Sequence, residues 1–264
     1  MSGDSSGILP PFDHERREPA PAMPRPDKPA LPKRFYRRAH AEVRDGLHAL
    51  LLDSRAALTP GRAPLAVPHA GVAEALVAEW QAQTQVIDPA TMPMTRLVNS
   101  IIDGVSRAQP EVAAEIARYA TSDLLCYRAD SPDRLVQRQA LLWDPLLEWA
   151  HEALGARFFL AQGVMFVEQP AQSRDAVARA IAAQTSPYAI GGLHVLTTLT
   201  GSALIALAVA HRHLTPEAAW TAAHVDEDVQ AEIWGVDAEA AARRAARLIE
   251  FTAAATLVDL AWSR

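Results

Sequence analysis

The chain has 264 residues, of which half are hydrophobic and 21% are charged, and its net charge is −6. This length allows one substantial core or two domains of unequal size, and the acidic balance argues against the broad phosphate neutralisation that nucleic-acid binding needs. The single cysteine, Cys126, excludes an internal disulfide and a multi-cysteine zinc site, so we expect a small buried hydrophobe.

The N-terminal segment differs in composition from the rest of the chain. Residues 1–33 contain eight prolines and several acids, and they lack the apolar stretch of a secretory signal. Such a composition cannot bury enough apolar surface to offset the ordering entropy. The sequence therefore predicts a disordered tail over residues 1–33.

The next segment carries turn signals between short apolar runs. Asp45-Gly46 separates two such runs, which is a strong short-range signal for a β-hairpin. The stretch 64–68 (PLAVP) reads as a further short strand bounded by prolines. These signals predict a small antiparallel β domain over residues 34–69.

From residue 70 onward the apolar residues follow a helical period, which predicts a larger all-α domain over residues 70–264 and hence an α+β fold. The first four expected helices cover 71–83, 94–108, 111–120 and 132–154, the last with an interruption at Asp144-Pro145. The next is capped by Ser173 and runs to Gln184, and another starts at Ser186-Pro187. The last two run from Thr215-Pro216 to Trp234, ending at Gly235, and from Asp237 to about Leu260.

One stretch raises the question of a membrane. Residues 193–209 are nearly free of charge, but they are at the short limit for a span and carry several hydroxyl side chains. We expect a buried central helix of a soluble bundle, with no stable membrane insertion. The preceding pair Gly191-Gly192 is typical of close helix packing rather than of a phosphate loop.

Catalytic templates are absent from the sequence. It contains no phosphate-binding loop, zinc helix, nucleophile elbow or dinucleotide fingerprint. His211 and His213 would point to different faces of a helix, which argues against a shared metal. We therefore expect no catalytic residue, no metal and no cofactor.

Several carboxylates leave an alternative open. Asp123 and Asp144 are best interpreted as helix caps or as buried ion pairs with Arg128 or Arg138. Together with the acids at 226–228 they could also line the cleft of an enzyme of unknown reaction.

The acidic triplet Asp226, Glu227 and Asp228 falls in the middle of the helix expected to end at Trp234. On that helix Glu227 would share a stripe with Ala223, Gln230 and Trp234. Runs of charge usually form a solvated face. An acid on the same helix face as Trp234 can instead anchor a basic residue of a partner.

Four stretches carry a resemblance to a known family: RFYRRAHAE, AEWQAQTQVIDPATMPMTRLVNSIID, SDLLCYRADSPDRLVQRQALLWDPLLEWA and DEDVQAEIWGVDAEA. In this order and spacing they resemble the assembly chaperones of the F-type ATP synthase catalytic head that act on the alpha subunit. The resemblance covers roughly residues 34–250. The alanine-rich stretch AALTPGRAPLAVP departs from the family's more regular strand and turn, which affects the expected strand boundaries.

The resemblance implies a non-enzymatic, monomeric protein that binds the unassembled alpha subunit and shields its beta-facing surface until the beta subunit displaces it. It also implies an important acid in the helix ending at Trp234-Gly235, which we place at Glu227 with Asp226, Asp228, Gln230 and Trp234 as neighbouring partner-binding residues. We expect a bacterial cytoplasmic location, or the mitochondrial matrix in a eukaryotic host.

Overall fold

The structure is a computed structural model that describes residues 30–162 and 167–262, nearly all of them within one compact unit, Pro32–Arg264. Apart from its last four residues, the tail expected over 1–33 lies outside the described residues. Lys33 forms an isolated antiparallel bridge with Val86, and the Pro32 carbonyl accepts from the Ile87 N–H at 2.8 Å.

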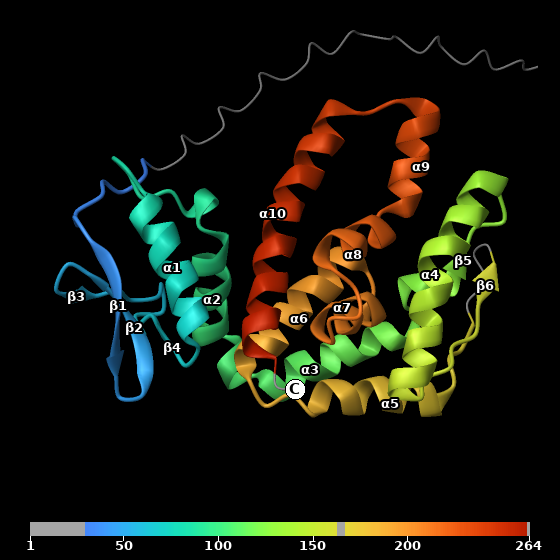
Figure 1. Ribbon diagram of the computed structural model, residues 1–264, viewed down its shortest axis with the longest axis horizontal. Helices are drawn as coiled ribbons and strands as arrows, with labels where there is room; N and C mark the ends of the chain where they lie inside the picture. The colour runs from blue at the N-terminus through green and yellow to red at the C-terminus, as the bar shows by residue number, and fades with distance from the viewer. Residues whose placement is uncertain (1–29, 163–166, 263–264) are drawn as a thin grey trace, which may run out of the picture. The chain divides into compact units, whose positions relative to one another are not determined.

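A small antiparallel sheet begins the described chain (Figure 1). Strands β1 (Ala39–Arg44) and β2 (Leu47–Leu52) form a two-residue hairpin, with Ala39 opposite Leu52. Asp45 and Gly46 close it with φ of 52° and 79°, the left-handed geometry that matches the strand twist. The predicted hairpin is confirmed. Strands β3 (Arg55–Ala56) and β4 (Ala66–Val67) both pair with β2, the latter inside PLAVP.

Helices make up most of the rest, and the α+β fold class is confirmed. The α-helices are α1 (Ala70–Ala82), α2 (Pro93–Asp103), α3 (Gln109–Arg118), α4 (Asp133–Leu154), α5 (Ala171–Ala182), α6 (Pro187–Thr200), α7 (Ala203–Ala210), α8 (Pro216–Ala223), α9 (Val225–Trp234) and α10 (Ala238–Ala261). A two-stranded parallel sheet pairs β5 (Tyr127–Arg128) with β6 (Ala161–Gln162). Buried side chains of the first sheet and of the helices join one hydrophobic cluster. The division at residue 70 into two domains stays a prediction.

The apolar stretch 193–209 is buried, as predicted, but it forms two helices rather than one. Helix α6 ends at Thr200, Gly201 follows with φ of 71°, and the Ser202 hydroxyl caps α7 by accepting from the Ile205 N–H at 3.0 Å. A left-handed glycine followed by a capping serine ends one helix and starts the next. Among the helices of the described residues, none is both long and apolar enough to cross a membrane.

Close helix packing at Gly191-Gly192 is confirmed. A Cβ on Gly192 would lie 2.7 Å from Val258 Cγ2 of α10, and one on Gly191 would lie 2.5 Å from Ile101 Cγ1 of α2. Helix α6 therefore approaches both neighbours more closely than any other residue type would allow.

Two predicted helix boundaries were wrong. Helix α4 continues through Pro145 because Trp143 and Leu146 on either side of it are buried in the core, and tertiary packing outweighs the missing hydrogen bond. Helix α5 starts at Ala171 after Pro170 rather than at Ser173. Ser173 is buried, and its hydroxyl donates to the Arg157 carbonyl instead of capping a helix.

The helix expected over 216–234 is also divided, between α8 and α9. His224 marks the break: its ring is buried, and its Nδ1–H donates to the Trp220 carbonyl at 2.8 Å. Burial lowers the pKa of His224, which favours the neutral form of the ring. The acidic triplet therefore lies in the first turn of α9, where acids favour the helix dipole, and not in the middle of a helix.

Asp123 is a cap, as the sequence suggested, and Asp144 forms the suggested ion pair with Arg128, but the Asp144 side chain is 58% exposed rather than buried. Asp123 is fully buried and accepts from the Ser202 hydroxyl at 2.6 Å and from the N–H groups of Leu125 and Leu204. Burial raises its pKa to about 6. Asp144 pairs with Arg128 at 2.7 Å. Cys126 is buried, as expected.

Candidate functional site

An exposed segment projects from the helical body. From Glu232 to Glu250 every residue except Arg244 is exposed; this segment, called the arch below, comprises the end of α9, the linker 235–237 and the first half of α10. In Figure 1 these parts stand clear of the other helices. Helix α10 returns to the core at Phe251, which is buried. Its alanine-rich first half is helical without a buried face because alanine has the highest helix propensity.

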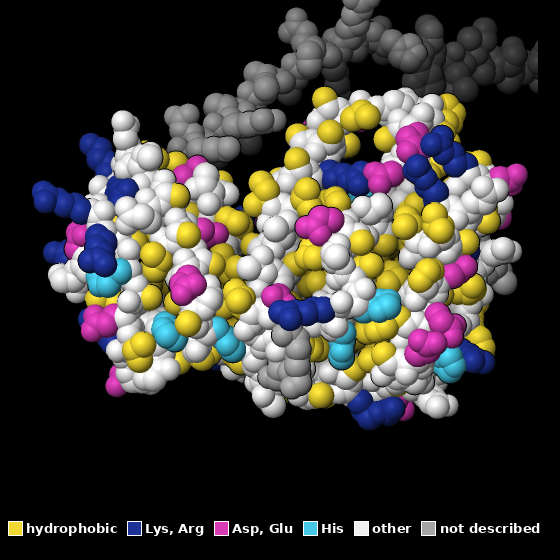
Figure 2. Space-filling view, viewed as in Figure 1, with side chains coloured by type: hydrophobic (Ala, Val, Ile, Leu, Met, Phe, Trp, Pro, Cys, Tyr) yellow, Lys and Arg dark blue, Asp and Glu magenta, His cyan; other side chains and the backbone are white. Residues whose placement is uncertain are grey.

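A cavity of about 1150 Å³ lies under the arch, between α4, α8, α9 and α10. Its apolar lining includes three side chains with large exposed fractions: Leu141 (73%), Trp234 (85%) and Val236 (74%). Side chains of this size rarely stay so exposed together, and such clusters mark sites of interaction. The yellow side chains around the opening under the arch are visible in Figure 2.

The charged lining of the cavity is largely paired within the protein. Asp228 pairs with Arg244, which joins α9 to α10, and Glu232 pairs with Arg134 and with Arg138 of α4. Arg247 donates to the Leu199 carbonyl at 2.9 Å, on α6. The ion pairs join α9 to α10 and to α4, and the Arg247 bond holds α10 to α6.

Asp226, which does not line the cavity, and Asp237, which does, hold α9 and α10 in place. Asp226 accepts from Gln139 Nε2 at 2.8 Å, and Gln139 is itself buried in α4. Asp237 caps α10 by accepting from the Glu239 N–H at 2.7 Å, as the sequence predicted. Both carboxylates therefore have structural partners.

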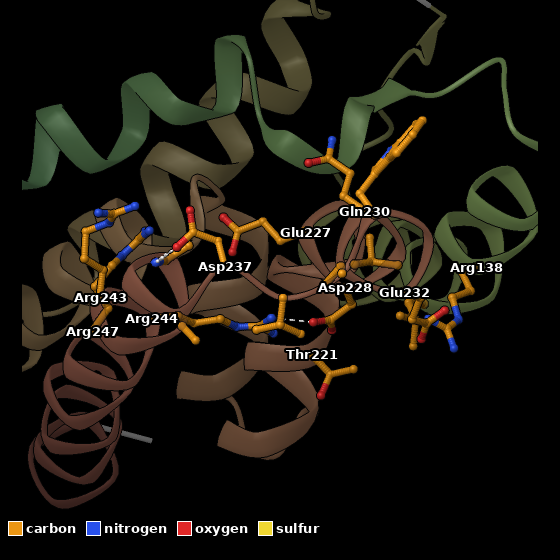
Figure 3. A pocket seen from close by; sticks show the side chains of 18 of the residues that line it. Arg138, Thr221, Glu227, Asp228, Gln230, Glu232, Asp237, Arg243, Arg244 and Arg247 are labelled. Atoms are coloured by element: carbon orange, nitrogen blue, oxygen red, sulfur yellow. Dashed lines mark hydrogen bonds and ion pairs between the residues drawn. The ribbon is translucent and has the colours of Figure 1, made fainter.

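Glu227 differs from these acids. Within the described part of the chain, it is the one acid lining the cavity that makes neither a hydrogen bond nor an ion pair. Figure 3 shows its carboxylate extending from α9 toward the side where Asp237 and the arginines of α10 lie, while a dashed line joins Asp228 to Arg244. An exposed carboxylate without an internal partner is available to a cation of another molecule.

The structure brings most of the predicted site together. Glu227, Asp228, Gln230 and Trp234 all line the cavity, whereas Asp226 does not. Ala223, which was expected on the same helix face as Glu227, Gln230 and Trp234, belongs to the preceding helix α8. Sequence reasoning missed the walls of the cavity supplied by other helices and by the linker 235–237: Arg138, Leu141, Val236, Arg244 and Arg247. The arginines at 243, 244 and 247 follow helical spacing, but nothing in the sequence connects them with residues 226–228.

The other candidate acids lie elsewhere. Asp123 is buried and Asp144 is paired with Arg128, and neither lines the cavity. In the described residues, no group of three or more His, Cys, Asp and Glu side chains could hold a metal ion.

Comparison with known proteins identifies the class. Residues 33–151 match the model of the ATP12 chaperone protein family. Atp12 from Paracoccus denitrificans has 38% sequence identity and a TM-score of 0.82 over 87% of this chain and 98% of that one. An aspartate-to-lysine mutant of the same protein gives a TM-score of 0.79 with the same identity and coverage. The Atu1473 protein of Agrobacterium tumefaciens has 46% identity and a TM-score of 0.84, over 87% of this chain and 86% of that one.

The shared fold thus defines an α+β chaperone with a small N-terminal sheet. The chain belongs to the ATP12 chaperone family, whose members act in ATP synthase assembly.

Proposed function

We propose that this chaperone binds the unassembled alpha subunit of ATP synthase and shields its beta-facing surface until the beta subunit displaces it. Family membership supports the role in assembly. The observation that carries the proposed site is that one cavity is lined both by an acid without an ion pair, Glu227, and by an exposed tryptophan, Trp234. Free subunits of an alternating ring expose apolar surface that aggregates unless it is covered.

We assign separate roles to the residues of α9. Glu227 forms a charge-assisted bond with a basic residue of the client, while Gln230 and Trp234 supply a polar contact and an apolar anchor. Asp226 and Asp228 act indirectly, because their bonds to Gln139 and Arg244 hold α9 against α4 and α10. A mixed surface of this kind binds selectively and still releases its client when a better-matched partner arrives.

The proposed role requires no catalysis. The rival reading, an enzyme with a carboxylate-lined cleft, would need acids that reach a substrate together. Asp123 is fully buried and its oxygens are occupied by Ser202 and backbone N–H groups, so it supports the fold instead. We further propose that the chaperone works as a monomer in the bacterial cytoplasm, or in the mitochondrial matrix of a eukaryotic host.

The decisive test compares two charge reversals that change the net charge equally. Glu227→Lys removes the unpartnered acid of the cavity, whereas Glu74→Lys alters an exposed acid on α1 that has no ion pair among the described residues. In pull-downs with purified alpha subunit, Glu227→Lys should weaken capture by about 2–5 kcal/mol, as expected for one partner of an interfacial charge pair. Glu74→Lys should bind as the wild type does.

Circular dichroism and urea unfolding check that both variants are folded. Equal capture by folded Glu227→Lys and wild type would remove Glu227 from the proposed interface. If the wild-type protein neither captures the purified alpha subunit nor suppresses its aggregation, the proposed client is wrong.

A further inference from the structure

Charge is distributed unequally along the folded chain. Residues 32–69, which carry the antiparallel sheet, contain seven lysines and arginines against three acids, a net charge of +4. Residues 70–264 contain fourteen against twenty-three, a net charge of −9. In Figure 2 several dark blue side chains lie over the sheet at the left, and others lie at the centre and the upper right of the molecule. An overall acidic protein with a basic sheet has a charge dipole that orients it before an anionic surface.

The cations concentrate at one end of the sheet, where β1 begins and β2 ends. We call this surface the basic end; its residues are Lys33, Arg34, Arg37, Arg38 and Arg55, with the aromatic Phe35. Phe35 is 62% exposed. Among the described residues, the side chains of Lys33, Arg37, Arg38 and Arg55 have no hydrogen-bond or ion-pair partner.

The backbone of the basic end is held rigidly. The Asp53 carboxylate accepts from the Arg37 N–H at 3.1 Å and from the Arg38 N–H at 2.9 Å, and the charges of Arg37 and Arg34 add to these bonds in lowering its pKa. Arg34 donates to the carbonyls of Tyr36 at 3.0 Å and Arg37 at 2.9 Å. These bonds fix the loop that carries the cations before any partner binds.

The aromatic residue of the basic end is also fixed in an outward position. The Phe35 ring meets the buried Tyr36 ring edge to face at 5.4 Å, and the Arg34 guanidinium lies 4.6 Å from the centre of the Tyr36 ring. A rigid exposed aromatic among cations costs little side-chain entropy to bind.

We propose that the basic end docks on the surface of a bilayer that contains anionic phospholipids. Basic residues supply long-range attraction to the headgroups, and an aromatic side chain at the same place inserts between them, which is the pair of signals that peripheral binding needs. The negative charge of residues 70–264 turns the remainder of the molecule away from the membrane. The proposal concerns a surface contact of the sheet and is independent of the cavity under the arch.

Vesicle co-sedimentation of the full chain tests the proposal. The protein should sediment with phosphatidylcholine vesicles that contain about one third phosphatidylglycerol and not with pure phosphatidylcholine, and rising salt should release it. Neutralising Arg37, Arg38 and Arg55 together to Gln should lower the partition coefficient about a hundredfold, since each cation near an anionic surface contributes about fivefold. Phe35→Ala should also weaken vesicle binding at low salt, because it removes the side chain that inserts between the headgroups.

A matched control replaces Arg107, Arg118 and Arg179, which are exposed on other parts of the chain, by Gln. It changes the net charge equally and should retain vesicle binding. Equal loss in both triple variants, or no sedimentation of the wild type with anionic vesicles, overturns the proposal. Capture of polyglutamate in place of vesicles overturns it in favour of an acidic protein partner. Capture of the alpha subunit, measured on the same variants, should be unchanged, which separates this proposal from the chaperone function.

Discussion

Replacing Gly192 by alanine tests how closely α6 and α10 pack. The added Cβ would lie 2.7 Å from Val258 Cγ2 and 3.2 Å from the Ala254 carbonyl oxygen. Carbon atoms normally rest about 3.5–4.0 Å apart, so the helices must separate or Val258 must move. The Ala254 oxygen belongs to the helix backbone and cannot rotate away.

Two opposing effects set the magnitude. Overpacking of a buried contact costs about 1–3 kcal/mol, whereas alanine gains up to about 1 kcal/mol over glycine in a helix interior. We therefore expect Gly192→Ala to lower the free energy of unfolding by about 1–2 kcal/mol. Urea unfolding followed by circular dichroism should show a lower midpoint with an unchanged m-value.

A second substitution identifies the cause of that loss. Val258→Ala removes the methyl group nearest to the added Cβ, so the double variant should be more stable than the sum of the two single losses predicts, by about 0.5–1 kcal/mol. A midpoint of Gly192→Ala equal to or above that of the wild type would show that propensity outweighs contact here. The reasoning on close packing would then be refuted.

Three further predictions concern other parts of the molecule. Burial raises the pKa of Asp123 to about 6, so its ionisation destabilises the folded protein as the pH rises from about 4 to about 6. Over this range the free energy of unfolding of the wild type, measured with urea, should fall by about 2–3 kcal/mol relative to that of Asp123→Asn. A difference between the two proteins that does not depend on pH would contradict this. Pro145→Ala restores an N–H inside α4 at an exposed position and should stabilise the protein by about 1–3 kcal/mol in the same assay, and an unchanged or lower urea midpoint would contradict this. Trp234→Ala should change stability by less than about 0.5 kcal/mol while weakening capture of the alpha subunit by about 2 kcal/mol, and a reversed order of the two effects would make Trp234 structural.

Local signals were sufficient to predict much of the fold. Asp45-Gly46 specified the hairpin because its geometry depends only on two residues with positive φ. Ser186, Thr215 and Asp237 were correctly identified as helix starts, since each hydroxyl or carboxylate caps its helix by accepting from an N–H two or three residues ahead.

The errors arose where distant packing decides the local structure. The continuity of α4 through Pro145 depends on the burial of Trp143 and Leu146 against other helices, which no local pattern reveals. The break at His224 depends on the contact of its ring with Trp220, at 3.9 Å between ring centres. For the same reason the sequence could nominate Glu227 and Trp234 but not the cavity they line, because Leu141 reaches it from the distant helix α4 and Arg244 reaches it only after the chain reverses between α9 and α10.

Helix α10 has a consequence for motion within the chaperone. Its second half, from Phe251 to Ala261, lies in the core, while its first half forms the arch with one continuous backbone. The arch can therefore fray and re-form by the helix–coil transition without opening the core, so amide hydrogen exchange should slow steadily from residue 240 toward residue 258. A client seated under the arch would slow exchange in the first half alone, and part of its binding energy would go into ordering that half of the helix.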